Sequence, residues 1–160
     1  MSPDERDARL MRRAVRRARE GIEAGQTPFG ACIARDGEVV ACEHNVVWAT
    51  TDITAHAEIH AIREACRELG RVDLSGLEIY TTCEPCPMCF AACHWARLDR
   101  IVYGARIEDA RAAGFNELGI TNEEMRRRGD SPVELTGGVE REACVELFRT
   151  WEERPGSRAY

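Results

Sequence analysis

Apolar residues recur every three or four positions in two long stretches of the chain, one near each end. This spacing predicts an amphipathic helix from Ser2 to about Gly25, in which Ser2 is the N-cap and Pro3 takes the first helical position. It predicts a second helix of this kind from Glu140 to about Trp151. The inward-facing positions are Leu10, Met11, Ala14, Val15, Ala18 and Ile22 in the first helix, and Ala143, Cys144, Leu147, Phe148 and Trp151 in the second.

Short β-prone runs alternate with helical patterns between these two helices. Residues 31–35 and 38–42 flank Asp36-Gly37, which predicts a β-hairpin. Further strands are predicted at residues 77–82, 100–104 and 133–136, and helices at residues 54–69, 85–96 and 121–128, with a helical turn at 108–113. No linker divides the chain, so we expect a single α/β domain over residues 1–160, with a mixed sheet covered by helices on both faces.

The formal net charge of −6 and the choice of basic residue limit the chemistry of the chain. All 22 basic residues are arginine, so the chain has no Schiff-base lysine and no P-loop lysine. Five arginines lie on the first helix, but acidic residues are interspersed with them, and we interpret this side as a solvated face. The acidic balance also disfavours a large polyanionic partner such as tRNA.

Two features lead us to expect a cytoplasmic protein. No apolar run approaches the roughly 18 residues that a membrane span needs. The N-terminus is charged from position 4 onward, which is not the pattern of a secretory signal. In a reducing compartment, eight cysteines favour metal binding and buried thiols over a disulfide framework.

Two short motifs carry the chemistry, His56-Ala57-Glu58 and Pro85-Cys86-Pro87-Met88-Cys89. One imidazole and two thiolates supply three ligands, and tetrahedral zinc then keeps one position for water. Cys86 and Cys89 share one face of a predicted helix start, where the helix N-terminus favours negative charge on sulfur. Glu58 is the candidate for moving protons between water and substrate. Together the motifs are typical of a zinc-dependent deaminase that acts on a nucleobase.

Other uses of the cysteines remain open at this point. Cys83, Cys86, Cys89 and Cys93 also fit the C-x2-C-x2-C-x3-C spacing of an iron–sulfur run, although such a run normally ends in proline. Cys83 could instead close a structural zinc site as the fourth ligand. Both alternatives leave the His-x-Glu motif without a role. We therefore interpret Cys83 and Cys93 as small buried residues, in common with Cys32, Cys42, Cys66 and Cys144.

The two motifs resemble those of the cytidine deaminase superfamily. Within it, the chain is similar to the bacterial guanine deaminases in four segments: Thr54-Ala55-His56-Ala57-Glu58, Cys83-Glu84-Pro85-Cys86-Pro87-Met88-Cys89, Trp95-Ala96-Arg97 and Ala113-Gly114-Phe115. The resemblance implies a three-layer α/β/α sandwich with a mixed five-stranded sheet. It also implies a homodimer in which the C-terminal helix and tail, residues 140–160, are exchanged or packed at the subunit interface.

The resemblance further implies a role for each residue of the site. The roles are His56, Cys86 and Cys89 as zinc ligands, Glu58 as proton shuttle, Phe29, Asn45 and Trp95 as base-binding residues, Glu117 as acceptor for purine N–H groups, and Tyr160 as the residue that closes the pocket, in the partner subunit. The residue types suit these roles, because aromatic faces stack on a flat base and a carboxylate accepts hydrogen bonds from guanine.

Two departures from the family pattern leave the substrate open. Asn116-Glu117 stand where two acids are usual, and the tail after Trp151 is short. The leading hypothesis is hydrolysis of guanine to xanthine and ammonia, while guanosine, cytosine or an aminotriazine would use the same catalytic residues. More distant hypotheses are adenosine deamination in tRNA and, from a different class, a non-catalytic zinc-binding interaction module.

Overall fold

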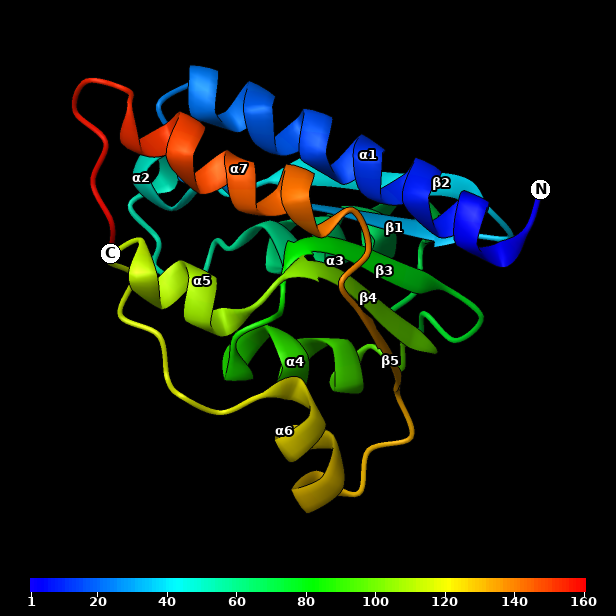
Figure 1. Ribbon diagram of the computed structural model, residues 1–160. Coiled ribbons are helices and arrows are strands. Elements are labelled where there is room, and N and C mark those ends of the chain that lie inside the picture. The colour runs from blue at the N-terminus through cyan, green and yellow to red at the C-terminus, as the bar shows by residue number, and fades with distance from the viewer.

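The computed structural model describes residues 1–160, and at its centre is one mixed sheet in the order β2-β1-β3-β4-β5 (Figure 1). The hairpin pairs β1 (Gly30–Arg35) with β2 (Glu38–His44), and β1 also runs antiparallel to β3 (Glu78–Cys83). The strands β3, β4 (Arg100–Ala105) and β5 (Glu134–Gly137) are parallel. The predicted mixed five-stranded sheet is confirmed.

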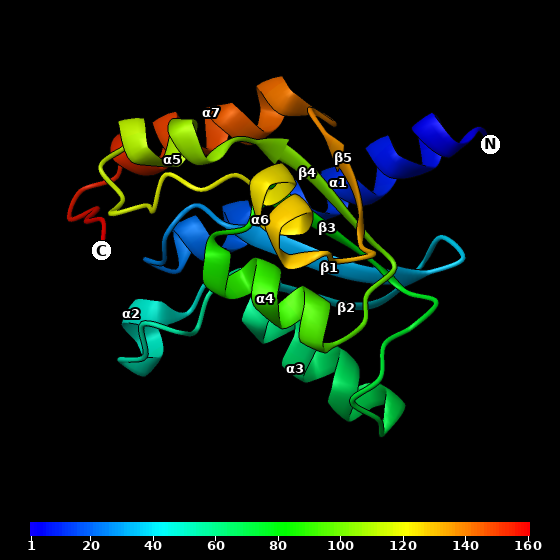
Figure 2. The same cartoon turned by 90° about the horizontal axis from the view of Figure 1, so that it is seen from below.

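Helices cover both faces of the sheet, as the two views of Figures 1 and 2 show. The helices α1 (Pro3–Glu23) and α7 (Arg141–Glu152) lie side by side on one face. The other face carries α3 (Ala57–Leu69), α4 (Pro87–Trp95) and α6 (Asn122–Gly129). Two short helices, α2 (Val47–Thr50) and α5 (Ile107–Ala112), lie near the C-terminus. The three-layer α/β/α sandwich is therefore confirmed.

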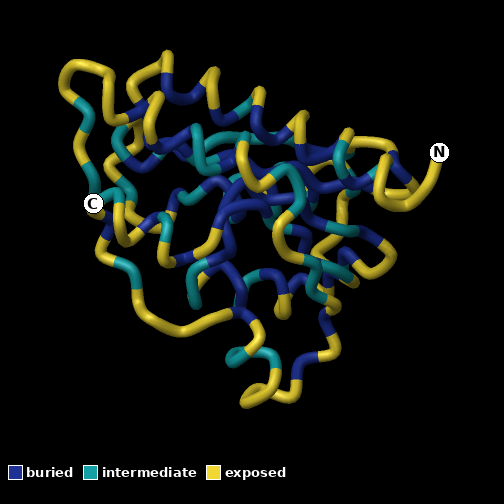
Figure 3. Tube along the Cα trace, viewed as in Figure 1, coloured by how far each residue is buried: buried dark blue, intermediate teal, exposed yellow.

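A hydrophobic core fills each side of the sheet, and most residues of the central strands are buried (Figure 3). On β3, Tyr80 belongs to the cluster under α1 and α7, whereas its neighbour Ile79 belongs to the cluster under α3 and α4. Successive strand residues point to opposite faces, so a strand covered on both sides buries residues at successive positions. None of the helices has the length and apolar composition that crossing a membrane requires.

Local sequence signals set the element boundaries where they were predicted. Ser2 and Glu5 form a reciprocal cap, in which the Glu5 amide donates to Ser2 Oγ at 3.2 Å and the Ser2 amide donates to Glu5 Oε2 at 2.7 Å. In the hairpin turn, Asp36 and Gly37 both adopt positive φ angles, 52° and 84°. Asp-Gly tolerates this backbone, which a tight hairpin turn requires.

A buried ion pair joins the α1 layer to three strands. Arg100 donates to both carboxylate oxygens of Asp7, at 2.6 and 3.1 Å, and the Tyr80 hydroxyl donates to the same carboxylate at 2.9 Å. Arg100 also donates to Thr136 Oγ1 on β5, at 2.9 Å. Because a buried charge is costly without its partner, this cluster fixes how α1 lies on the sheet.

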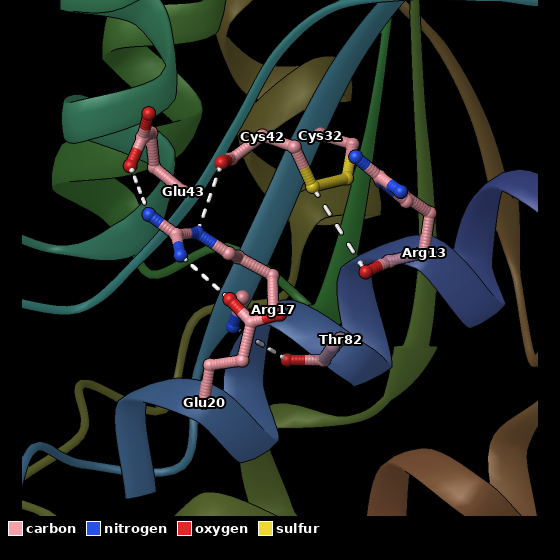
Figure 4. The surroundings of a disulfide bond; sticks show 8 residues. Arg13, Arg17, Glu20, Cys32, Cys42, Glu43 and Thr82 are labelled. Carbon is pink, nitrogen blue, oxygen red and sulfur yellow. Dashed lines mark hydrogen bonds and ion pairs between the residues drawn. A yellow bond between two sulfur atoms is a disulfide. The ribbon is translucent and has the colours of Figure 1, made fainter. Parts of the chain in front are cut away.

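The expectation that Cys32 and Cys42 are free thiols is wrong, because they form a disulfide across the hairpin (Figure 4). The two residues are directly paired in the β1–β2 register, which brings their side chains face to face. Arg17 of α1 lies beside them, donating to the Cys42 carbonyl at 3.1 Å and to Glu43 Oε2 at 3.0 Å. The hairpin is thus tied covalently within itself, and Arg17 links it to α1 by one ion pair and one hydrogen bond.

Candidate active site

The starts of two helices bring the predicted metal ligands together. His56 is the N-cap of α3, Cys86 is the N-cap of α4, and Cys89 lies in the first turn of α4. The Nδ1 atom of His56 is 3.6 Å from each of the two Sγ atoms, and all three ligand atoms lie within 4.8 Å of one another. No other group of three potential ligand side chains is as closely assembled in residues 1–160.

The spacing and chemistry of this group fit zinc. Zinc binds sulfur at about 2.3 Å and imidazole nitrogen at about 2.1 Å, so tetrahedral angles separate N from S by about 3.6 Å. That separation is the one found between His56 and each thiol. A set of two thiolates and one imidazole leaves one tetrahedral position for a non-protein ligand, as in catalytic zinc sites.

The two sulfur atoms are electrostatically different. The pKa of Cys86 is lowered to about 4, chiefly by a hydrogen bond from Cys89, against the effect of burial and with help from His56. The pKa of Cys89 is raised, because its proton is held in that same hydrogen bond and because it is buried. One thiolate is therefore present near neutral pH, and a divalent cation needs to displace only one further proton.

Glu58 is buried directly behind the ligand group. It is the second residue of α3 and lines a small inner cavity together with His56, Cys86 and Glu117. Burial raises the pKa of Glu58, while the nearby His56 opposes the rise. A raised pKa makes the carboxylate a stronger base towards water, which is a property that a proton shuttle needs.

A larger cavity of about 260 Å³ opens in front of the ligands. Its walls come from the α5–α6 loop, residues 113–121, from the start of α4 and from the tail. Glu117 belongs to both cavities, and its pKa is raised to about 7, first by burial and then by the negative charges of Cys86 and Glu58. The lining is otherwise largely apolar, with Ile53, Met88, Phe115 and Leu118 among its members.

Tyr160 closes one side of this cavity from within its own chain. Its ring stacks on His56 with the centroids 5.5 Å apart, and its hydroxyl accepts a hydrogen bond from Asn45 Nδ2 at 2.6 Å. Two residues earlier in the tail, the Arg158 guanidinium lies 3.8 Å from the Trp48 ring centre, and Trp48 Nε1 donates to the Arg158 carbonyl at 3.2 Å. The tail is therefore fastened at two points.

Asn45 and Phe29 meet at the open end of the hairpin. The Asn45 amide donates to the Phe29 carbonyl at 3.1 Å, and Asn45 Oδ1 accepts from the Val47 amide at 3.0 Å. The Phe29 ring lines the inner cavity and packs edge-on against Phe115, with the centroids 5.0 Å apart. The structure thus gathers His56, Glu58, Cys86, Cys89, Phe29, Asn45, Glu117 and Tyr160 into one place.

Trp95 is the exception among the predicted site residues. It lies at the C-terminal end of α4, away from both cavities, and its surface is 84% exposed. Within one chain, the structure does not bring it together with the other residues. Its role in base binding remains a prediction.

Four residues line or support the site without having been assigned to it from the sequence. Phe115 forms part of the cavity wall, and it belongs to the Ala-Gly-Phe segment that already marked the region. Trp48 and Arg158 fasten the tail, and no local pattern links two residues so far apart. Cys83 lines the inner cavity, but its Sγ donates to the Arg106 carbonyl at 3.5 Å and it is not a member of the three-ligand group.

The fold and this ligand group define a zinc-dependent aminohydrolase. Residues 4–105 match the family described as the cytidine and deoxycytidylate deaminase zinc-binding region. The chain belongs to this family.

Particular relatives share long stretches with the chain. It is 47% identical to the guanine deaminase of Bacillus subtilis (strain 168) over 115 residues, which cover 71% of this chain and 74% of the relative. It is 34% identical to the tRNA-specific adenosine deaminase of the same organism over 138 residues, 86% of this chain and 83% of the relative. Among solved structures, NE0047 in complex with 2,6-diaminopurine superposes with a TM-score of 0.86 at 29% identity, covering 95% of this chain and 84% of that one.

The three-ligand group makes a testable prediction about metal content. We expect Cys86→Ala to abolish zinc binding, because the two remaining ligands are too few for a stable site, whereas Cys83→Ala should retain about one zinc per chain. Metal analysis of the purified proteins by mass spectrometry checks both variants. Loss of zinc from Cys83→Ala would instead indicate a closed four-ligand structural site.

Proposed function

We propose that the chain hydrolyses a free purine base, guanine, to xanthine and ammonia. The observation that carries the proposal is the shared cavity, in which the Glu117 carboxylate faces the same space as the metal ligands and the ring of Tyr160. Guanine is a flat bicyclic ring with N–H donors along one edge. A largely apolar cavity with a single carboxylate suits such a ring, because the walls stack on its faces and the carboxylate accepts from its edge.

The chain's own residues have separate tasks in this reaction. When zinc is bound by His56, Cys86 and Cys89, it supplies the Lewis acidity that makes water nucleophilic near neutral pH. Glu58 accepts a proton as water attacks C2 of guanine, and delivers it to the ring nitrogen beside that carbon. A second proton transfer through Glu58 releases the amino group as ammonia. Burial raises the pKa of Glu58 and so suits it to both transfers.

The tail supports a free base over a nucleoside or a tRNA. Tyr160 is fastened over one side of the cavity, and Arg158 holds the tail against Trp48, so the tail restricts the space available to a ribose or a polynucleotide chain. The similarity to a guanine deaminase supports the same choice. The similarity to a tRNA-specific adenosine deaminase keeps tRNA as the second candidate, but the net charge of −6 disfavours a polyanion.

We propose further that the protein is a cytoplasmic homodimer and that the exposed side of α4 forms the contact. Met88 and Trp95 are seven residues apart, and therefore lie on one face of this helix. They are 36% and 84% exposed, whereas most large apolar side chains of the chain are buried. The helix α7 packs on the chain's own α1 and β4, and Tyr160 of the tail bonds to the chain's own Asn45, so this contact does not require their exchange.

The role of Glu58 is tested by turnover. Glu58→Gln should keep the fold and the zinc but lose a factor of about 10² to 10⁴ in ammonia release from guanine, since the amide cannot carry a proton between water and base. Guanosine and an RNA anticodon stem–loop are assayed alongside. Glu68→Gln, on the exposed side of the same helix, is the control. Unaltered turnover by Glu58→Gln would show that another group moves the proton.

The role of Glu117 is tested by the pH dependence of KM. The pKa of Glu117 is raised to about 7, and only the ionised carboxylate accepts hydrogen bonds at both oxygens. The KM for guanine should therefore fall as the pH rises through about 7 and level off above it. We expect Glu117→Gln to remove this slope and raise KM at pH 8, and the exposed Glu108→Gln to keep the wild-type profile. An identical slope in Glu117→Gln would contradict the assignment.

The proposed dimer contact is tested by light scattering. Trp95→Glu places a charge in the contact, and its desolvation should shift the protein from dimer to monomer. Val72→Glu introduces the same charge at another exposed apolar position, which is 81% exposed, and should leave the dimer intact. A monomeric wild-type protein, or an unchanged mass for Trp95→Glu, would refute the proposed contact.

A further inference from the structure

A buried carboxylate close to the zinc ligand Cys86 binds the starts of two helices. Glu84 is only 6% exposed and lies between the end of β3 and the ligand Cys86. Its Oε2 atom accepts from the Asn122 amide at 2.8 Å, and its Oε1 atom accepts from the Ile107 amide at 3.4 Å. Its own amide donates to the Ala105 carbonyl at 2.8 Å. Neither zinc binding nor proton transfer uses this side chain.

The two amides that Glu84 binds are helix starts. Ile107 is the first residue of α5, and Asn122 is the first residue of α6. Amides in the first turn of a helix lack partners within the helix, and the positive end of the helix dipole favours a carboxylate. One buried carboxylate therefore satisfies two helices at once. A second link runs parallel to it, because Asn122 Nδ2 donates to the Pro85 carbonyl at 2.6 Å.

The α5–α6 loop runs between these two anchored points and carries Glu117 (Figure 1). Most of the loop is exposed. Its own backbone hydrogen bonds are short-range, from Glu117 to the Phe115 carbonyl and from Ile120 to the Leu118 carbonyl. Away from its ends, the loop is held by the buried Phe115 ring and by two hydrogen bonds. The Tyr160 carbonyl in the tail accepts from the Asn116 amide, and the Arg111 guanidinium donates to the Glu117 carbonyl at 3.1 Å.

We propose that Glu84 is a positioning residue. It fixes the α5–α6 loop, which carries Glu117, relative to residues 84–86, which carry the zinc ligand Cys86. The same short segment that presents Cys86 thus also sets where Glu117 stands in the cavity. The identity of the bound base rests on the proposed function, but the mechanical link between the two loops does not. Glu84 acts through Glu117 and touches neither substrate nor metal.

The test replaces Glu84 by glutamine, which keeps the shape but turns one acceptor oxygen into an NH₂ donor. One of the two helix-start amides then loses its acceptor in a buried place. We expect KM for guanine to rise about tenfold while kcat changes by less than about twofold, with unchanged zinc content. In hydrogen exchange, residues 113–121 should exchange faster while α3 does not change.

A matched control and a second variant complete the experiment. Glu123→Gln removes the same charge one residue beyond Asn122, on the exposed side of α6, and should behave as wild type. If Glu84→Gln does not fold, Glu84→Asp serves in its place: it keeps the charge but shortens the side chain by one methylene, so that the carboxylate no longer reaches both helix-start amides, and should speed exchange in residues 113–121. Unchanged loop exchange, or an equal rise in α3, overturns the proposal. Failure of the wild type to turn over guanine overturns the proposed substrate instead, and leaves the exchange result decisive for Glu84.

Discussion

The structure depends on the meeting of two helix starts at one end of the sheet. The strand β3 delivers the chain to Cys86, and the segment after the hairpin delivers it to His56, so both ligands occupy N-cap positions. N-cap residues have extended backbone and stand outside the helical hydrogen-bond ladder, which frees their side chains to converge. Fixing this meeting point requires β1, β3 and β4 to be packed on both faces, and the two core clusters provide that packing.

Negative charge is concentrated around that point. Glu58, Glu117 and Cys86 line the same inner cavity. Burial raises the pKa of both carboxyl groups, Cys86 raises both further, and Glu58 adds to the rise of Glu117. Such a collection of buried acidic groups is stable only if some stay protonated or a cation is present. Zinc binding and protonation therefore both reduce the repulsion among these buried negative charges. The raised pKa of Glu58 suits the proton transfers that the proposed reaction requires.

Local patterns predicted the parts of the fold that local chemistry decides. The Ser2 cap, the Asp36-Gly37 turn and the ligand spacing each depend on neighbours within a few residues, and the structure has all three. Features set by register or by tertiary approach were not predictable in this way. The Cys32–Cys42 disulfide depends on which residues face each other across the hairpin, and the Asp7–Arg100 pair joins residues 93 positions apart. Trp95 shows the same limit, because its motif did not indicate that it would point to solvent.

The fastening of the tail gives the protein a built-in optical reporter. Trp48 lies 6.1 Å from Tyr160 and under the Arg158 guanidinium, whereas Trp151 is buried near Phe115 and Trp95 stands in solvent. The three indole rings therefore lie in environments of three different polarities. With phenylalanine at positions 95 and 151, the remaining tryptophan fluorescence comes from Trp48 alone, and it changes when the tail moves away from Trp48. Opening of the cavity could then be followed in real time, without a dye and without turnover.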